Sequence, residues 1–304
     1  MTRILNMGSI NIDYVYAVPH FVQAGETLSS TARQIFPGGK GMNQSVALAR
    51  AGGGFAASSN VTHAGMVGDD GGQLIEVLQG AGVDTSLIAK SGSPTGHTVI
   101  QVIPEGENCI LLFPGANQEL DEAFVDNALA PFSKDDILVL QNEVSCIAYA
   151  MKSAKAKGMR IAFNPSPFGP EISGYPLDLV DWWLLNEIEG QALTGKNDPN
   201  DMLAAMGELF PKAVVVLTLG EEGVLCLANA EVLRHDSYKV KVLDTTAAGD
   251  TFTGYFISSI AKGIDTPEAL RLASVAASIS VSRQGAAVSI PLWDEVVGVS
   301  LSSG

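Results

Sequence analysis

Two carboxylates flank a run of small residues in the stretch DTTAAGDTFTGYF, which covers residues 244–256. Asp250 is expected to begin a helix whose apolar side holds Phe252 and Phe256. Backbone N–H groups at a helix start lack partners, so those of residues 247–250 would form a concave anion site. A carboxylate beside that site suits phosphoryl transfer if it binds the attacking hydroxyl, because this reaction tolerates a weak base. Taken alone, Asp250 is equally well explained as an ordinary helix cap.

A second candidate ligand site is the glycine-rich stretch PGGKGMNQSVALARAG, residues 37–52, which leads into a helix. Its glycines would let a ligand approach the backbone closely, although a flexible helix start explains them too. Neither serine nor threonine follows Lys40, so the stretch is not a P-loop. The later GGGFAA, residues 52–57, matches a dinucleotide fingerprint loosely but follows a helix, which favours a cap and turn. A nicotinamide-dependent oxidoreductase therefore lacks its expected motif.

Composition excludes several other classes. Hydrophobic residues make up 46% of the 304 positions, so a large core can form, and the net charge of −15 argues against nucleic acid. Three widely separated cysteines are typical of a reduced cytosolic protein, and no apolar run reaches membrane length, so we expect a soluble cytoplasmic protein. The sequence contains no HExxH, CxxC or GxSxG motif, so nothing in it supports a metalloprotease, a structural zinc site or a serine hydrolase.

From about residue 116 onward, short apolar runs alternate with helical patterns. The runs DDILVLQNE, MRIAFNPSP, VDWWLLNEIEG and AVVVLTLGEEG are apolar on both faces, which is typical of buried parallel strands. Helical spacing is expected at 117–131, at 199–210 and in a helix capped by Thr266, and KVKVLD at 239–244 is expected as a strand. The pattern predicts a three-layer α/β/α, Rossmann-like domain. Ligands in such sheets bind at the carboxyl ends of strands, which here carry Glu143, Asn164, Asn186, Glu189, Thr218, Gly220 and Asp244.

Two stretches, 13–37 and 96–113, alternate like half-exposed strands instead. We expect them to form a small β-sheet lid inserted into the main domain, which would comprise 1–12, 38–95 and 114–304. Few helices remain to cover the apolar face of this lid. A ligand, a second copy of the chain, or both would cover it.

The motifs GSINIDYV, AGETLSS, PGGKGMNQ, NEIE, TLGEEG and DTTAAGDTF occur in an order and at spacings that resemble the ribokinase family of sugar kinases, within the phosphofructokinase-B group. The resemblance covers essentially the whole chain, and GGKGMNQ and DTTAAGD are its most specific parts. It implies an ATP-dependent kinase that phosphorylates the 5-hydroxyl of D-ribose. Deoxyribokinase, fructokinase and nucleoside kinase activities remain open, as does a non-catalytic sugar or nucleotide sensor.

The same resemblance implies the roles of individual residues. Asp250 would be the catalytic base, beside an anion hole of Ala247, Ala248 and Gly249. Sugar-binding positions would be Asn11, Asp13, Gly39, Lys40, Gly41, Asn43, Glu143 and Asp250. Nucleotide-binding positions would be Asn186, Thr218, Leu219, Gly220, Glu221, Gly223, Gly249 and Ser274.

Two cations and a partner are also implied by the resemblance. Glu187 and Glu189 lie where Mg²⁺ would be held through water, chiefly by Glu189. An activating K⁺ would be bound, mostly by backbone carbonyls, at Asp244, Thr246, Ser280, Arg283, Gly285 and Ser289. A homodimer with interlocking lids is expected. Met42 and His97 depart from the family pattern, and we expect them to influence which pentose fits.

Overall fold

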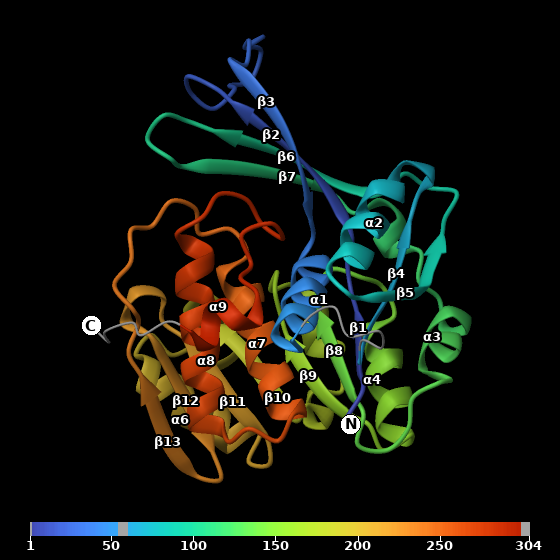
Figure 1. Ribbon diagram of the computed structural model, residues 1–304, viewed down its shortest axis with the longest axis vertical. Coiled ribbons are helices and arrows are strands. Elements are labelled where there is room, and N and C mark those ends of the chain that lie inside the picture. The colour runs from blue at the N-terminus through green and yellow to red at the C-terminus, as the bar shows by residue number, and fades with distance from the viewer. Residues whose placement is uncertain (1, 54–59, 299–304) are drawn as a thin grey trace.

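The computed structural model describes residues 2–53 and 60–298. Figure 1 shows a large sheet with helices on both faces and a smaller sheet that projects from one end. The large sheet has nine strands in the order β13-β12-β11-β10-β9-β8-β1-β4-β5, and all its pairings are parallel except those of β12 with β11 and β13. The strands are β1 (Ile4–Met7), β4 (Val61–Val67), β5 (Asp84–Lys90), β8 (Ile137–Gln141), β9 (Arg160–Asn164), β10 (Trp182–Asn186), β11 (Val214–Thr218), β12 (Val224–Ala228) and β13 (Glu231–His235).

Helices bury both faces of this sheet, which explains why inner strands such as β8, β10 and β11 are apolar at nearly every position. Along β8, Ile137 and Val139 belong to one core, while Leu138 and Leu140 belong to the other. The first core is completed by α1 (Lys40–Ala51), α2 (Gly72–Gly80), α7 (Ala248–Ala261), α8 (Thr266–Val281) and α9 (Trp293–Val297). The second is completed by α3 (Glu122–Leu129), α4 (Ile147–Ala156), α5 (Glu187–Thr194) and α6 (Pro199–Leu209). The predicted three-layer α/β/α fold is confirmed.

The smaller sheet has the order β3-β2-β6-β7 and is formed by the two stretches with strand-like alternation. Its strands are β2 (Asn11–Ala17), β3 (Ala32–Gly38), β6 (Gly96–Val102) and β7 (Asn108–Phe113). Asp13 pairs with Phe36 and Thr98, so these side chains share one face. His97 pairs with Ile12 and lies on the opposite face.

Two expected elements differ from the structure. The N-cap of α8 is Asp265 and not Thr266, because the Asp265 carboxylate accepts the Glu268 N–H at 2.9 Å. The segment KVKVLD does not form a strand. It runs beside the end of α8, where the N–H groups of Leu243 and Asp244 both donate to the carbonyl of Val281.

Two further expectations concern the end of α1 and membrane spans. Gly52 caps α1 as expected, since its N–H donates to the carbonyls of Leu48 and Ala49, whereas residues 54–57 of the GGGFAA stretch lie outside the described residues. Within 2–53 and 60–298, the structure contains no helix with the length and apolar character that a membrane span requires.

A buried histidine lies on β4, the strand next to the edge strand β5 of the large sheet. His63, on β4, is fully buried, and burial lowers its pKa to about 4. Its Nε2 lies 3.2 Å from the carbonyl oxygen of Gly8, and its Nδ1 lies 2.7 Å from Ser45 Oγ. Because the Gly8 carbonyl can only accept, Nε2 carries the hydrogen and Nδ1 accepts from Ser45.

This histidine should make stability depend on pH. Its pKa is about 4 in the folded chain and about 6.5 when unfolded, so its contribution is complete above pH 6.5 and is lost as the pH falls toward 4. Between pH 7 and pH 5, we expect the free energy of unfolding to fall by about 2 kcal/mol more in the wild type than in His63→Gln. Urea unfolding at the two pH values measures the difference. Equal pH dependence in both proteins would contradict a neutral buried His63.

Candidate active site

The turn that precedes α7 leaves backbone donors exposed. Ala247 adopts a left-handed conformation with φ 62°, which is costly for a residue with a side chain. It is also the N-cap, and it offers no side-chain acceptor to the first turn of the helix. In the part of the chain that the structure describes, the N–H groups of Gly249 and Asp250 have no hydrogen-bond partner. A side chain added at Gly249 would meet nothing within 4 Å, so this end of α7 is open to a ligand.

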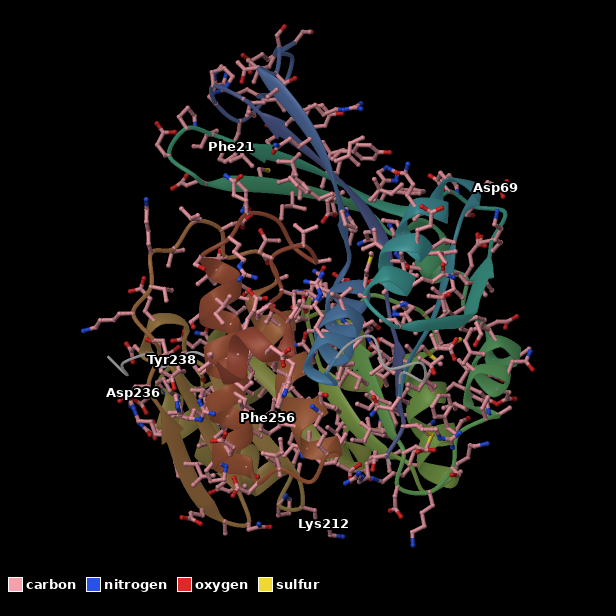
Figure 2. All side chains as sticks on the ribbon, in the orientation of Figure 1. Phe21, Asp69, Lys212, Asp236, Tyr238 and Phe256 are labelled. Atoms are coloured by element: carbon pink, nitrogen blue, oxygen red, sulfur yellow. The ribbon has the colours of Figure 1, made fainter. Side chains whose placement is uncertain are left out.

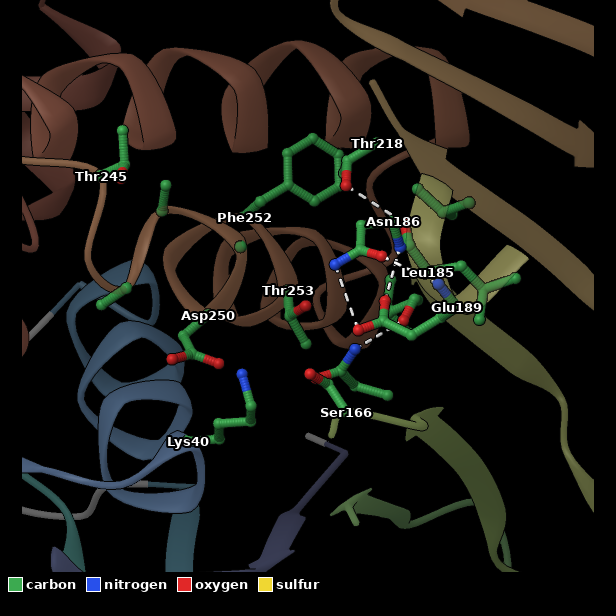
Figure 3. A pocket seen from close by; sticks show the side chains of 16 residues that line it. Lys40, Ser166, Leu185, Asn186, Glu189, Thr218, Thr245, Asp250, Phe252 and Thr253 are labelled. Atoms are coloured by element: carbon green, nitrogen blue, oxygen red, sulfur yellow. Dashed lines mark hydrogen bonds between the residues drawn. The ribbon is translucent and has the colours of Figure 1, made fainter. Parts of the chain in front are cut away.

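The open turn lines a cavity of about 210 Å³, together with Lys40, Ser166, Asn186 and Glu189. Figure 3 shows the Lys40 side chain directed toward the Asp250 carboxylate. Burial alone would lower the pKa of Lys40, but the negative charges of Asp250, Glu143 and Glu189 outweigh it and raise that pKa. The cavity therefore contains a permanent ammonium group and open N–H donors, which is a suitable lining for phosphate.

The Asp250 carboxylate is held by two amides of α1. It is 8% exposed; Oδ2 accepts from Asn43 Nδ2 at 3.0 Å, and Oδ1 accepts from Gln44 Nε2 at 2.9 Å. Buried carboxylates need such donors to remain charged. The other amide atom of Asn43, Oδ1, is buried without a partner among the described residues. An unpaired acceptor beside a carboxylate is where a ligand hydroxyl could donate.

Asn11 and Asp13 lie where β2 leaves the main domain. Asp13 Oδ1 accepts from Thr98 Oγ1 at 2.6 Å, and burial raises the Asp13 pKa more than this bond lowers it. Asn11 Oδ1 accepts from Asn117 Nδ2 at 2.7 Å, which leaves the Asn11 NH₂ group to donate elsewhere. The pair thus presents a donor and an acceptor side by side, which matches the two functions of a hydroxyl group.

The glycines of PGGKG serve the protein's own packing as well as any ligand. A side chain at Gly38 would overlap the Asp13 carboxylate, and one at Gly41 would overlap the backbone of Ser9. Gly39 has φ 92°, a conformation that disfavours other residues. The sequence predicted that these glycines admit a ligand; in the structure, the groups that approach Gly38 and Gly41 belong to the chain itself.

Glu143, just after β8, faces the start of α1. Its Oε2 accepts from Ser9 Oγ and from the Lys40 N–H at 3.0 Å, which leaves Oε1 without a partner among the described residues. Burial raises the pKa of Glu143, and the Lys40 charge opposes that shift. Glu143 can therefore accept one further hydrogen bond from a ligand.

A second cavity, of about 770 Å³, shares a wall with the first and is large enough for a nucleotide. Leu219 does not line it, because its side chain is buried in the core of the opposite face. The predicted nucleotide residues that do line it are Asn186, Thr218, Gly220, Glu221, Gly223, Gly249 and Ser274. The sequence prediction missed Ser237, Tyr238, Lys239, Val240 and Val242, of which the last three lie in the segment 239–244 that was expected to be a sheet strand.

Hydrogen bonds join three of the expected potassium residues, Asp244, Thr246 and Gly285. Burial would raise the pKa of Asp244, but hydrogen bonds from the N–H groups of Thr246 and Gly285, each 2.9 Å long, outweigh it and lower that pKa. The bond from Gly285 joins the turn before α7 to the loop after α8. The Arg283 side chain pairs with Glu295, so only its carbonyl remains for a cation.

The other two expected potassium residues use their hydroxyls locally. Ser280 Oγ donates to Ala277 O at 2.9 Å, and Ser289 Oγ donates to Ala286 O at 2.8 Å, so each hydroxyl hydrogen is used within the chain. Within 2–53 and 60–298, no group of three His, Cys, Asp or Glu side chains gathers as a metal site. Backbone carbonyls and Asp244 are thus the groups that fit a potassium ion here.

Glu189 is engaged in a capping box at the start of α5. Its carboxylate accepts the N–H of Asn186 at 2.7 Å and the Asn186 side-chain amide at 3.1 Å, as Figure 3 shows. With both oxygens occupied, Glu189 suits a magnesium ion held through water better than one held directly. Glu187 is exposed and lines the larger cavity.

Met42 and His97 were expected to influence the fit of the sugar; the structure places Met42 in the core and His97 on the face of the small sheet opposite Asp13. Met42 is fully buried in the core beneath α1. His97 lies on the face of the small sheet opposite Asp13, where its ring contacts those of Phe113 and Tyr14. Strand alternation separates it from the sugar-binding candidates.

Comparisons with known proteins agree with this geometry. The family model "pfkB family carbohydrate kinase" matches residues 1–293. The ribokinase of Haemophilus influenzae is 36% identical over 300 residues, which cover 96% of each chain. The deoxyribokinase of Salmonella typhi is 31% identical over 294 residues, which cover 94% of each chain.

Solved structures give the same result. The ribokinase of Cryptococcus neoformans in complex with ADP is 33% identical, with a TM-score of 0.85 and coverage of 98% of this chain and 99% of that one. The ribokinase of Arabidopsis thaliana complexed with ribose and ATP is 28% identical, with a TM-score of 0.83 and coverage of 98% of each chain. The predicted class of enzyme, an ATP-dependent carbohydrate kinase, is confirmed. The chain belongs to the pfkB family of carbohydrate kinases.

Proposed function

We propose that this protein transfers the γ-phosphoryl group of ATP to the 5-hydroxyl of D-ribose. The observation that carries the proposal is the position of Asp250, a buried carboxylate at the same helix start as two unpaired N–H donors. The relatives named ribokinase, one of them solved with ribose and ATP, support ribose as the acceptor.

In the reaction, Asp250 accepts the proton of the sugar hydroxyl. The hydroxyl oxygen forms a bond to the γ-phosphorus, while the bond from that phosphorus to the β,γ-bridging oxygen breaks and ADP leaves. The N–H groups of Gly249 and Asp250 and the ammonium group of Lys40 stabilise the negative charge on the transferred group. A carboxylate suffices as the base because bonding to the nucleophile is slight in a loose transition state.

The sugar would be held by groups that lie on three sides of the cleft. Asp13 accepts from its hydroxyls and Asn11 donates to them, while the unpaired Oε1 of Glu143 and Oδ1 of Asn43 accept from others. A polyol that lacks one of these hydroxyls leaves a buried polar group unpaired, which lowers its affinity.

The triphosphate would lie in the larger cavity, with its γ-phosphate at the smaller one. Asn186, Thr218 and Ser274 are candidates to contact the nucleotide, and Lys239 adds a cation that the sequence prediction did not include. Mg²⁺ held through water near Glu189, and K⁺ bound at Asp244 and the carbonyls of the loop after α8, would neutralise phosphate charge and fix the turn before α7.

The small sheet would act as a lid over the sugar and as the contact between two copies of the chain. Every residue of β7 is exposed, and Leu111 is 71% exposed. An apolar edge strand left in water favours association. We therefore propose a homodimer through the lid, which sedimentation equilibrium of the full chain tests.

One second substrate has a specific observation in its favour. The deoxyribokinase of Salmonella typhi is 31% identical over nearly the whole chain, so 2-deoxy-D-ribose is the first alternative to D-ribose. Fructose and nucleosides are weaker alternatives within the same family. A non-catalytic sensor is disfavoured because Asp250, the open turn and Asp13 are all present.

ADP release over a panel of acceptors tests the proposed substrate. We expect kcat/KM for D-ribose to exceed that for 2-deoxy-D-ribose, D-fructose and a nucleoside by at least about tenfold, because each misfit leaves buried acceptors unpaired. The assay is run in potassium and again in sodium, and we expect the faster rate in potassium. A higher kcat/KM for the nucleoside would refute the assignment.

The role of Asp250 is tested by Asp250→Asn. The amide keeps the shape of the side chain but cannot accept the proton, so we expect turnover to fall by about 10³-fold. Calorimetry should show binding of ATP and ribose within about threefold of the wild type, since the asparagine oxygen can still accept a hydrogen bond from the sugar hydroxyl and the other sugar contacts remain. Wild-type turnover in this variant would show that another group acts as the base.

The sugar contact of Asp13 is tested by Asp13→Asn. Loss of a charged acceptor should lower kcat/KM for the sugar by about 10- to 100-fold and leave KM for ATP unchanged. The matched control is His97→Phe, which changes the next strand of the same sheet on its opposite face. If both variants lose sugar affinity to the same extent, the effect belongs to the lid as a whole and not to Asp13.

A further inference from the structure

A chain of buried hydrogen bonds runs from His63 on β4 to the Asp250 carboxylate. It begins at the carbonyl of Gly8, which can only accept, so His63 donates to it from Nε2. The neutral His63 then accepts the Ser45 hydroxyl at Nδ1. Ser45 Oγ is left to accept, and it does so from Asn6 Nδ2 at 2.8 Å.

The orientation of the Asn6 amide determines the orientation of the Gln141 amide, at the end of β8. Asn6 Nδ2 also donates to the carbonyl of Gly41 at 2.7 Å, so its amide orientation is determined twice. Its Oδ1 accepts from Gln141 Nε2 at 2.9 Å, and the same Nε2 donates to Gln44 Oε1 at 2.7 Å. Gln141 Oε1 has no partner among the described residues, so the function of this buried amide lies in its two donated bonds.

Gln44 is consequently oriented with its oxygen toward Gln141 and its NH₂ toward Asp250. A second contact favours the same orientation. Asn164 Nδ2 donates to the Leu184 carbonyl at 2.8 Å, which turns Asn164 Oδ1 toward Gln44 Nε2 at 3.4 Å. If the Gln44 amide were reversed, two acceptors would face its oxygen and the Asp250 carboxylate would lose a donor.

We propose that Gln44 is a positioning residue for Asp250, and that Gln141 acts through Gln44 by fixing the orientation of its amide. This inference rests on the proposed function of Asp250 as the base. Together with Asn43, Gln44 restricts the carboxylate to one geometry, so that the lone pair that accepts the proton is aligned with the sugar hydroxyl before the reaction begins.

The test combines Gln44→Met, Gln141→Met and the double variant. Methionine keeps the chain length and removes the amide. For Gln44→Met, we expect kcat to fall by about tenfold while KM for ribose and for ATP stays within about twofold. For Gln141→Met, we expect a fall of about threefold in kcat, because the Gln44 amide still donates to Asp250 in those molecules in which it keeps its orientation. The matched control is Gln79→Met on α2, whose amide bonds only Thr85 on the surface.

The double variant separates positioning from a general packing effect. If Gln141 acts through Gln44, Gln44→Met with Gln141→Met has the same kcat as Gln44→Met alone. Multiplied losses would refute the action of Gln141 through Gln44, and an unchanged kcat in folded Gln44→Met would refute the whole inference. Thermal unfolding shows whether Gln141→Met folds. If it does not, the kcat and KM values of Gln44→Met still decide whether Gln44 positions Asp250.

Failure of this inference is distinguishable from failure of the proposed function. Asp250→Asn, measured in the same assay, reports on the base itself. Wild-type turnover of Asp250→Asn would overturn the base and, with it, the positioning role. Loss of turnover in Asp250→Asn together with normal kinetics in Gln44→Met would leave the proposed function standing and overturn only the inference.

Discussion

A buried carboxylate must be matched by donors, and this constraint ties together the two helices that form the site. Asp250 on α7 takes both of its hydrogen bonds from α1. The helices can supply them because they cross closely: a side chain at Gly254 would overlap Ala47, so glycine is what allows the approach. Figure 2 shows Phe256, further along α7, in the interior of the molecule, where it is fully buried and helps to fix that crossing.

The approach of α1 to α7 also brings together the groups that can bind a polyphosphate. A chain with net charge −15 repels a polyphosphate at long range, so binding must depend on local groups. Lys40 is kept charged by three carboxylates around it, and the turn at Ala247 aims unpaired N–H groups into the same cavity. In a site shielded from water, these few donors act more strongly than the distant surface charge.

Much of the polar interior serves to orient groups that would bind or react. Thr98 and Asn117 determine which atoms of Asp13 and Asn11 remain available, and Ser9 does the same for Glu143. Such amides and hydroxyls are costly to bury unless each has its partner. Among the described residues, the buried Asn43 Oδ1 has no partner, and it belongs to the side chain that donates to Asp250.

The sequence by itself determined the layered fold, because strands buried on both faces must be apolar throughout, and this pattern is readable in runs such as ILVLQ of β8. It also identified DTTAAGD and GGKGMNQ as the chemical centres. It failed for KVKVLD, where alternation suggested a strand, because an extended segment beside a helix end has the same local pattern as one in a sheet. Only the tertiary structure decided that Gln44, Gln141 and His63 share one hydrogen-bond chain, and that His97 faces away from Asp13. These relations depend on which strands become neighbours and in what register, and residues such as Gln44 and Gln141, 97 positions apart in the sequence, carry no local record of that choice.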